Sequence, residues 1–144
     1  MATDRSANVV WQGDLMNGSG TIAQVPSGAF GPLDVSWASR AEEPNGKTSP
    51  EELIAAAWAS CFAMALSNGL AKAGNPPEKL ETSATVTFQP GEGIIRGALV
   101  VRGTVPSLDE AGFLAAAEDA KQNCPVSKAL SGIPDISLDA TLAS

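Results

Sequence analysis

The sequence of 144 residues contains no histidine and no tyrosine. Without histidine the chain has no Ser-His-Asp or Cys-His nucleophilic pair, no histidine-ligated metal site and no imidazole proton shuttle. Lysine and arginine total 9 against 16 aspartates and glutamates, so the net charge is −7 and no basic cluster forms. Nucleic-acid binding needs such a cluster to displace phosphate counterions and is therefore excluded; contact with anionic lipid is disfavoured for the same reason.

Cysteine is scarce as well. Only Cys61 and Cys124 are present, far apart and outside any CxxC pair, which excludes a disulfide scaffold and a cysteine-ligated zinc site. The polar residues 1–8 lack the apolar segment of a secretory signal. The longest apolar run, Leu53–Leu66, is shorter than the roughly 20 residues of a membrane span. We therefore expect a cytoplasmic protein without a membrane partner.

Helix signals are strongest in the middle of the chain. Ser49, Pro50 and Glu52 form an N-cap, a first helical position and a capping-box partner, and they predict a helix that runs to Lys72 and ends at Gly74. A second capping box predicts a helix over residues 107–123, with Ser107 as N-cap and Glu110 at its third position, and a short helix follows over 125–130. The first helix is apolar around its whole circumference, so one sheet cannot cover it and we expect a homodimer.

Strand signals surround these helices. Alternating apolar and polar residues predict strands over residues 8–15, 20–25, 34–40, 81–89, 94–105 and 135–142, with a hairpin turn at Asn17–Gly18. Residues 1–7 are expected to form a loose end. Strands and helices that come in separate runs indicate an α+β fold, in a single domain over residues 1–144.

The two cysteines have different surroundings. Cys61 lies in the apolar helix, whereas Cys124 precedes Pro125 at a helix start, where free N–H groups and the helix dipole favour a thiolate. Three interpretations are open: two small buried apolar side chains, a structural disulfide, or a redox pair. A buried Cys61 thiol stays protonated and inert unless a cation lies beside it. Arg40 is the candidate cation, and a solvated strand end is its alternative role.

Glu51 also has two interpretations. It benefits from the dipole at the start of the helix, and that is a complete structural explanation. It also lies about 15 Å along the helix from Cys61, so the two share a site only if an arginine bridges them, the helix bends, or one of them comes from the other chain. Four apolar side chains of this helix either belong to the core or line an apolar pocket beside Cys61: Leu53, Trp58, Phe62 and Met64.

Two segments resemble the signature segments of the OsmC/Ohr family of osmotically inducible and organic-hydroperoxide-resistance proteins. They are residues 48–67, TSPEELIAAAWASCFAMALS, and residues 123–130, NCPVSKAL. Residues 35–40, VSWASR, are more similar to the OsmC branch than to the Ohr branch. The order of strands and helices over residues 8–142 fits the family too, so the resemblance covers nearly the whole chain.

The resemblance implies a thiol peroxidase that needs no metal or other cofactor. It implies an intertwined dimer of antiparallel sheets with a central buried helix and two active sites at the interface. Cys61 would be the peroxidatic cysteine, Cys124 the resolving cysteine, and Arg40 the cation that holds the Cys61 thiolate, with Glu51 orienting Arg40. Trp58 departs from the family, in which a histidine or tyrosine is frequent, and this affects the expected substrate preference.

The implied chemistry reduces an organic hydroperoxide, and also hydrogen peroxide if the pocket admits it. The Cys61 thiolate becomes a sulfenic acid, Cys124 condenses with it to a disulfide, and an external dithiol, a dihydrolipoyl carrier in relatives, reduces the disulfide. An apolar pocket wall would favour organic peroxides. The alternative is a non-catalytic dimeric binding protein for a small apolar ligand on the same fold; a cysteine hydrolase is disfavoured because no histidine base exists.

Overall fold

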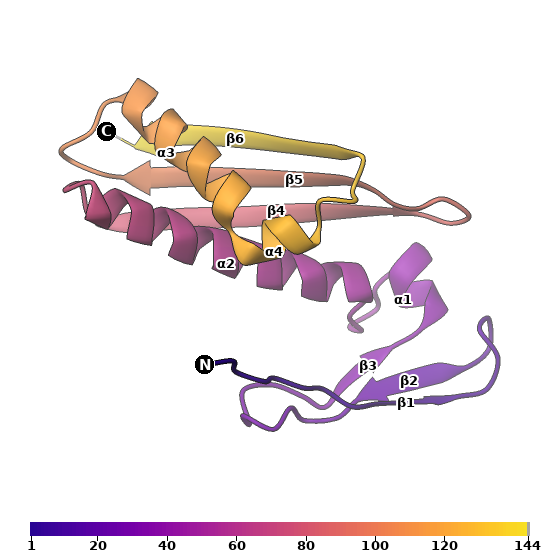
Figure 1. The fold of residues 1–144 in the computed structure, drawn as a ribbon. Coiled ribbons are helices and arrows are strands. Elements are labelled where there is room, and N and C mark those ends of the chain that lie inside the picture. Colours follow the sequence, from indigo (N-terminus) through magenta and orange to yellow (C-terminus); the bar gives the residue numbers. More distant parts are fainter. Residues whose placement is uncertain (144) are drawn as a thin grey trace. The chain divides into compact units, whose positions relative to one another are not determined.

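The computed structural model describes residues 1–143 and divides the chain into two compact units, Met1–Leu53 and Ile54–Ser144 (Figure 1). Each unit has its own three-stranded sheet. Both helices and strands are present, so the predicted α+β class is confirmed. That residues 1–144 act as a single domain stays a prediction.

The first unit contains the antiparallel sheet β1-β2-β3, formed by Val9–Gln12, Ser19–Ile22 and Leu33–Val35. The predicted hairpin is confirmed, because Gln12 pairs with Ser19 across the turn. The first strand ends earlier than predicted. Asp14 is the reason: its carboxylate accepts the backbone N–H of Asn17 at 2.7 Å and closes a local turn in place of further strand pairs.

The strand predicted over residues 34–40 is wrong. The strand stops at Val35, and residues Trp37–Ala41 form the short helix α1. Ser36 and Ser39 make a capping box: the Ser36 hydroxyl accepts the backbone N–H of Ser39 at 3.1 Å, and the Ser39 hydroxyl accepts that of Ser36 at 2.9 Å. These two bonds satisfy donors that a strand would have left for a partner. Arg40 therefore lies on a helical turn.

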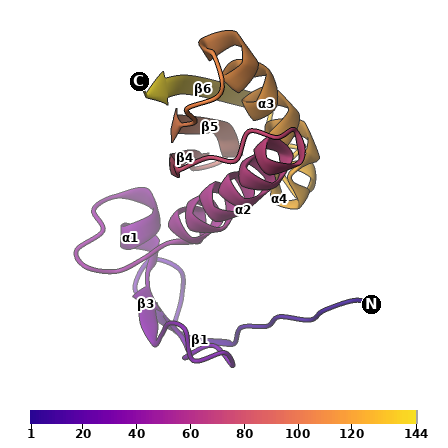
Figure 2. The same cartoon turned by 90° about the vertical axis from the view of Figure 1, so that its left-hand side faces the viewer.

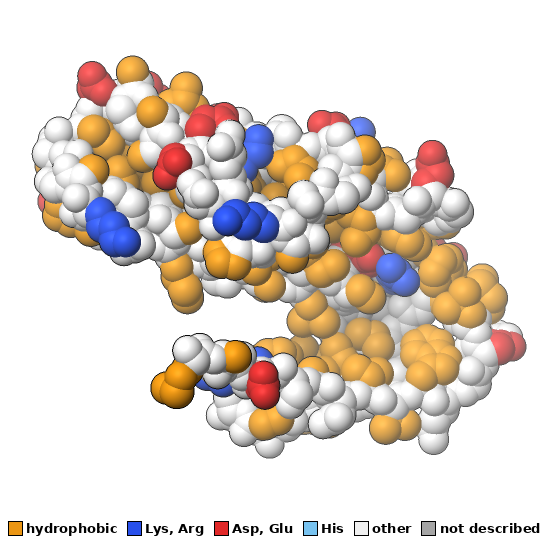
Figure 3. All heavy atoms as spheres, viewed as in Figure 1, with side chains coloured by type: hydrophobic (Ala, Val, Ile, Leu, Met, Phe, Trp, Pro, Cys, Tyr) orange, Lys and Arg blue, Asp and Glu red, His pale blue; other side chains and the backbone are white. Residues whose placement is uncertain are grey.

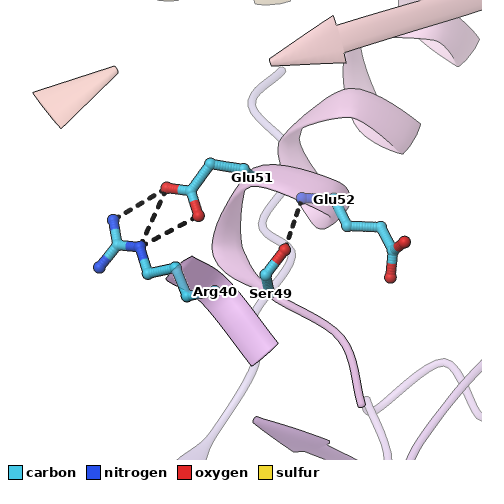
Figure 4. Close-up of polar contacts among 4 residues, drawn as sticks. All are labelled: Arg40, Ser49, Glu51 and Glu52. Carbon is cyan, nitrogen blue, oxygen red and sulfur yellow. Dashed lines mark hydrogen bonds and ion pairs between the residues drawn. The ribbon is translucent and has the colours of Figure 1, made fainter. Parts of the chain in front are cut away.

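The predicted long helix is confirmed as α2, Pro50–Lys72. The Ser49 hydroxyl accepts the backbone N–H of Glu52 at 3.1 Å, as an N-cap should (Figure 4). The Glu52 carboxylate accepts the Thr48 hydroxyl at 2.8 Å instead of completing the predicted capping box. At the other end Gly74 adopts a φ of +86°, the left-handed conformation that terminates helices.

The second unit is built on the sheet β4-β5-β6, formed by Lys79–Gln89, Gly93–Thr104 and Asp135–Ala143. Strands β4 and β5 are antiparallel, but β5 and β6 are parallel, which corrects the expectation of purely antiparallel sheets. Helices α3, Glu110–Asn123, and α4, Pro125–Ala129, lie between β5 and β6 in the chain. A connection of this length lets the next strand return in the same direction.

Helix α3 begins later than predicted. Asp109, not Ser107, is its N-cap, and its carboxylate accepts the backbone N–H of Gly112 at 2.8 Å. The Ser107 hydroxyl instead donates to the Asn75 side-chain carbonyl at 2.8 Å. Both residues are suitable caps, and the extended backbone of Asp109 decides between them.

The core of the second unit lies between its sheet and its helices, which cover one face of the sheet (Figures 1 and 2). Helix α2 buries four side chains at intervals of four residues against it: Trp58, Phe62, Leu66 and Leu70. From the sheet, Leu99 and Val101 of β5 point into the same core. This one-sided cover leaves Met64 of α2 72% exposed.

Apolar side chains also reach the surface in both units, as the orange atoms of Figure 3 show. Helix α2 is longer than the apolar run within it and, by length and composition alone, could cross a membrane. The core helix of a soluble protein meets the same test. Four of its large side chains pack in the core of the second unit, and a membrane span would have to withdraw them from the sheet.

Candidate active site

Cys124 lies where two helices meet. It is the C-cap of α3 and the N-cap of α4, with Pro125 at the first position of α4. Its backbone N–H donates to the Ala120 carbonyl at 2.8 Å, and its own carbonyl accepts the Lys128 N–H at 3.0 Å. The side chain is fully buried. These bonds fix the Cys124 backbone on both sides, so its sulfur has a defined position.

Cys61 projects from the middle of α2 toward this point. The Sγ atoms of Cys61 and Cys124 lie 2.8 Å apart, close enough for one thiol to donate a hydrogen bond to the other. Both cysteines are free, and the separation exceeds the roughly 2.05 Å of a disulfide bond. The structure thus places the two cysteines side by side as free thiols, and a redox role for the pair stays a prediction.

The two thiols differ in acidity. Burial raises the pKa of Cys61, and its hydrogen bond with Cys124 raises it further, while the Val126 N–H opposes both. Burial also raises the pKa of Cys124, but the polar groups around its sulfur, from Cys61, Ser127 and Val126, outweigh burial and lower the pKa below its ordinary value. The two thiols hydrogen-bond to each other, so they lose their protons as a coupled pair.

Ser127 was missed by the sequence analysis. It is buried and lies in α4, which Cys124 caps. Its own hydroxyl oxygen accepts the Trp58 indole N–H at 2.7 Å. A usable signal was present: Ser127 stands three residues after the N-cap Cys124, the spacing at which capping residues face one another.

The predicted pocket wall is partly corrected. Trp58 and Phe62 are completely buried in the core and so cannot present a surface to a ligand. Met64 does line a groove that also includes Cys61, with α2 on one side and α3 and Pro125 on the other. Leu53 is half-buried, and its place in a pocket stays a prediction.

Arg40 and Glu51 form an ion pair in the first unit (Figure 4). The Nε of Arg40 donates to both carboxylate oxygens of Glu51 at 3.0 and 3.2 Å, and its Nη2 donates to one of them at 2.8 Å. The Glu51 side chain is only 7% exposed, against 33% for Arg40. A carboxylate this deeply buried needs such a paired fork of donors, which in turn fixes the plane of the guanidinium.

The structure therefore brings the four predicted catalytic residues together as two pairs. Cys61 meets Cys124 in the second unit, and Arg40 meets Glu51 in the first. That the two pairs form one active site stays a prediction. Within residues 1–143, no group of three or more His, Cys, Asp or Glu side chains is arranged to hold a metal ion.

Comparison with known protein families and curated proteins gives a consistent result. The family described as OsmC-like protein matches residues 43–139. Peroxiredoxin OsmC of Escherichia coli (strain K12) is 37% identical over 147 residues, and the alignment covers 100% of both chains. An organic hydroperoxide resistance protein of Xanthomonas axonopodis pv. citri (strain 306) is 34% identical over 95 residues, which is 63% of this chain and 65% of the relative.

Solved structures share the fold. An OsmC-like protein from Mycoplasma pneumoniae superposes with a TM-score of 0.75 at 14% identity, covering 100% of both chains. The organic hydroperoxide resistance protein OhrB of Bacillus subtilis superposes with a TM-score of 0.66 at 25% identity, covering 96% of this chain and 98% of that one.

Proposed function

The chain belongs to the OsmC-like protein family, and on this premise we propose that it is a thiol-dependent peroxidase that reduces organic hydroperoxides to alcohols. The predicted family is confirmed, and the full-length match to a peroxiredoxin OsmC agrees with the predicted branch. The observation that carries the proposal is the pair of free thiols with sulfurs 2.8 Å apart. Two thiols in this arrangement supply both the nucleophile and the group that resolves its oxidised form.

The first step requires a thiolate at Cys61. The dithiol loses one proton to become a pair with a single negative charge, and the remaining proton lies between two sulfurs at hydrogen-bonding distance. A cation near Cys61 shifts the proton to Cys124 and leaves the charge on Cys61. Arg40, oriented by Glu51, is the residue we assign to this task.

The reaction then proceeds in two bond exchanges. The Cys61 sulfur attacks one oxygen of the hydroperoxide, an S–O bond forms and the O–O bond breaks, and the departing alkoxide takes the Cys124 proton to become the alcohol. The Cys124 thiolate left by this transfer attacks the Cys61 sulfur, forms the disulfide and expels hydroxide, which takes up the proton that the dithiol first released and becomes water. An external dithiol, such as a dihydrolipoyl group, returns the disulfide to two thiols and becomes a disulfide itself.

We also propose that the working molecule is a homodimer. Helix α2 buries one side against its own sheet and leaves Met64 exposed beside the Cys61 groove. A second copy would cover this side and exclude water from the groove. An apolar wall of this kind favours organic peroxides over hydrogen peroxide, because the alkyl group gains from leaving water.

The cytoplasm is the compartment that we assign to this activity. The catalytic cycle returns to two free thiols at every turnover, and it therefore needs a reducing pool of dithiols, which cytoplasmic conditions maintain.

The test is turnover of a bulky alkyl hydroperoxide and of hydrogen peroxide with dihydrolipoamide as reductant. The wild type is expected to reduce the alkyl hydroperoxide faster. Cys61→Ser should abolish turnover, while Cys124→Ser should retain one stoichiometric reaction and accumulate a Cys61 sulfenic acid that dimedone labels.

Retained peroxidase activity in Cys61→Ser would contradict the assignment. A wild type that consumes no peroxide, but binds an apolar hydroperoxide equally well with and without the Cys61 thiol, would instead identify a binding protein. Size-exclusion chromatography with light scattering tests the dimer, and a monomer at all accessible concentrations would overturn that part.

A further inference from the structure

We propose that Trp58 and Ser127 are a positioning pair whose buried hydrogen bond ties α2 to α4 and so holds the Cys61 and Cys124 sulfurs where the disulfide closes. This inference rests on the proposed function and concerns its second step, in which Cys124 resolves the oxidised Cys61. It gives Trp58, which is fully buried, a role other than lining a substrate pocket.

The hydrogen bond joins the two helices that present the cysteines. Trp58 precedes Cys61 by three residues in α2, and Ser127 follows Cys124, the N-cap of α4, by three residues. Residues three apart are neighbours on one face of a helix. The Trp58 indole N–H donates to the Ser127 hydroxyl oxygen at 2.7 Å, and the two sulfurs lie 2.8 Å apart. The hydrogen bond and the thiol contact therefore belong to the same contact between α2 and α4.

Helix α4 depends on such contacts for its position. It spans only Pro125–Ala129, and a helix of five residues is not stable by itself. Val126 and Leu130 pack partly buried against the core, but apolar packing is not directional. The hydrogen bond from Trp58 to Ser127 requires a narrow range of distance and angle. It is therefore the contact that defines where α4 lies against α2.

The Trp58 side of this bond cannot follow a displaced α4. The indole ring lies directly over Gly97 of β5, where a Cβ atom would come within 2.5 Å of the ring. Only glycine leaves room for the indole to approach the strand this closely. Both residues are buried, so an indole N–H that loses the Ser127 oxygen would be left without a partner in the core, which is costly. Displacement of α4 is therefore resisted.

The position of α4 decides how closely the sulfurs approach. The Cys124 carbonyl accepts the Lys128 N–H at 3.0 Å, so the Cys124 backbone moves with α4. If α4 is free to move, the effective concentration of the Cys124 thiol at the Cys61 sulfur falls, and disulfide closure slows. The same freedom is lost when the disulfide forms, so the equilibrium shifts toward the dithiol. The hydrogen bond accordingly favours both the rate of closure and the stability of the disulfide.

The first test measures the disulfide without any peroxide. The full chain is equilibrated with mixtures of oxidised and reduced dithiothreitol, and free thiols are counted by maleimide labelling and mass spectrometry. As the protein S–S bond forms, two electrons and two protons pass to oxidised dithiothreitol, which becomes the dithiol. Ser127→Ala is expected to lower the equilibrium constant for disulfide formation by about fivefold. Trp58→Phe keeps a ring over Gly97 without the N–H and should cause a similar loss of about fivefold.

A double variant separates positioning from stability. Because Trp58→Phe combined with Ser127→Ala leaves no buried N–H unpaired, it should recover part of the unfolding free energy lost in Ser127→Ala. Its equilibrium constant for disulfide formation should nevertheless stay as low as in either single variant, because the tie between the helices is absent. Ser127→Thr retains a hydroxyl and should restore the constant. A role in stability alone predicts that the constant does not change in any of these variants.

Thr82→Val is the matched control. The Thr82 hydroxyl donates to the Ala59 carbonyl at 3.1 Å and so joins α2 to β4 instead of α4. Its loss should leave the equilibrium constant for disulfide formation unchanged. An equal fall in Thr82→Val and Ser127→Ala, no fall in either Ser127→Ala or Trp58→Phe, or additive falls in the double variant would overturn the inference.

A single-turnover reaction tests the rate of closure. One equivalent of an alkyl hydroperoxide is added with dimedone present, so that dimedone and Cys124 compete for the Cys61 sulfenic acid. In Ser127→Ala the ratio of dimedone adduct to disulfide should rise by about fivefold, while the rate of peroxide consumption stays as in the wild type. An unchanged ratio would overturn the inference. No peroxide consumption together with the expected shift in the dithiothreitol equilibrium would count against the proposed function alone.

Discussion

Replacement of Glu51 by glutamine tests whether the buried ion pair serves the peroxidatic thiol. The carboxylate receives three contacts from Arg40, at 2.8 to 3.2 Å, and is 7% exposed. Removal of one partner of a fully buried pair costs about 3–5 kcal/mol. Arg40 is 33% exposed, so water replaces part of what it loses, and glutamine retains one oxygen acceptor. We therefore expect Glu51→Gln to lower the free energy of unfolding by about 2 kcal/mol.

The effect on catalysis should be larger than the effect on stability implies. A guanidinium that is no longer held in one plane loses its defined position, and misplacement of a catalytic group by about 1 Å costs on the order of 100-fold in rate. We expect kcat/KM for an alkyl hydroperoxide to fall by about 10- to 100-fold in Glu51→Gln. Arg40→Lys keeps the charge but not the fork and should cause a similar loss.

A double-mutant cycle supplies the decisive comparison. If Glu51 acts through Arg40, Glu51→Gln should add little to the loss of kcat/KM already caused by Arg40→Lys. Glu52→Gln is the matched control, because Glu52 lies on the same helical turn, carries the same charge and contacts Thr48 instead. Equal losses in the Glu51 and Glu52 variants would reduce the effect to helix-terminus electrostatics and refute the reasoning. Additive losses along the cycle would do the same.

Two further predictions follow from the packing and acidity of the second unit. Gly97→Ala should destabilise the protein by about 1–3 kcal/mol in urea unfolding, because its Cβ would meet the Trp58 ring at 2.5 Å; Gly69→Ala, a helical site with open space, should be neutral or stabilising. Because the pKa of Cys124 is lowered in the folded protein, the free energy of unfolding increases as pH rises through that pKa. Because the pKa of Cys61 is raised, the unfolded chain loses this proton first, and the free energy of unfolding falls again above the ordinary thiol value of about 8.5. The difference in unfolding free energy between wild type and Cys124→Ala should thus peak near pH 8.5, and a monotonic difference would contradict these directions.

Long elements with strong end signals were predictable from sequence. Helix α2 carries its start in Ser49 and Pro50 and its end in Gly74, and strands β4 and β5 alternate over many residues. The short segment after Val35 was not predictable in the same way, because its apolar residues alternate as in a strand while a serine pair caps a helix of one turn. Local hydrogen bonding decided between these two readings, and alternation over so few residues carries little weight.

Strand direction and partner choice lie outside what periodicity can reveal. The pattern of β6 shows which side chains face the core, but it contains nothing about whether the strand runs parallel to its neighbour. The connection through α3 and α4 was the available clue. In the same way, the surroundings of the two cysteines in the sequence suggested a redox pair. Their 2.8 Å approach was not predictable, because it depends on how α2 packs beside the α3–α4 junction.

The singly charged dithiol has two forms, one with the charge on Cys61 and one with the charge on Cys124, and the first is the form that the proposed reaction with a peroxide needs. A guanidinium about 4 Å from the Cys61 sulfur would favour this form by about 4 kcal/mol at an effective dielectric constant of 20.

Arg40 should accordingly govern peroxide reactivity without governing the first ionisation of the dithiol. In Arg40→Lys, the thiolate absorbance of the reduced protein should still appear below the ordinary thiol pKa, because the causes that lower the pKa of Cys124 lie within the second unit. The rate of reaction with an alkyl hydroperoxide should nevertheless fall, because less of the charge resides on Cys61. A parallel loss of both properties would mean that the arginine, and not the surroundings of the cysteines within the second unit, sets the acidity of the pair.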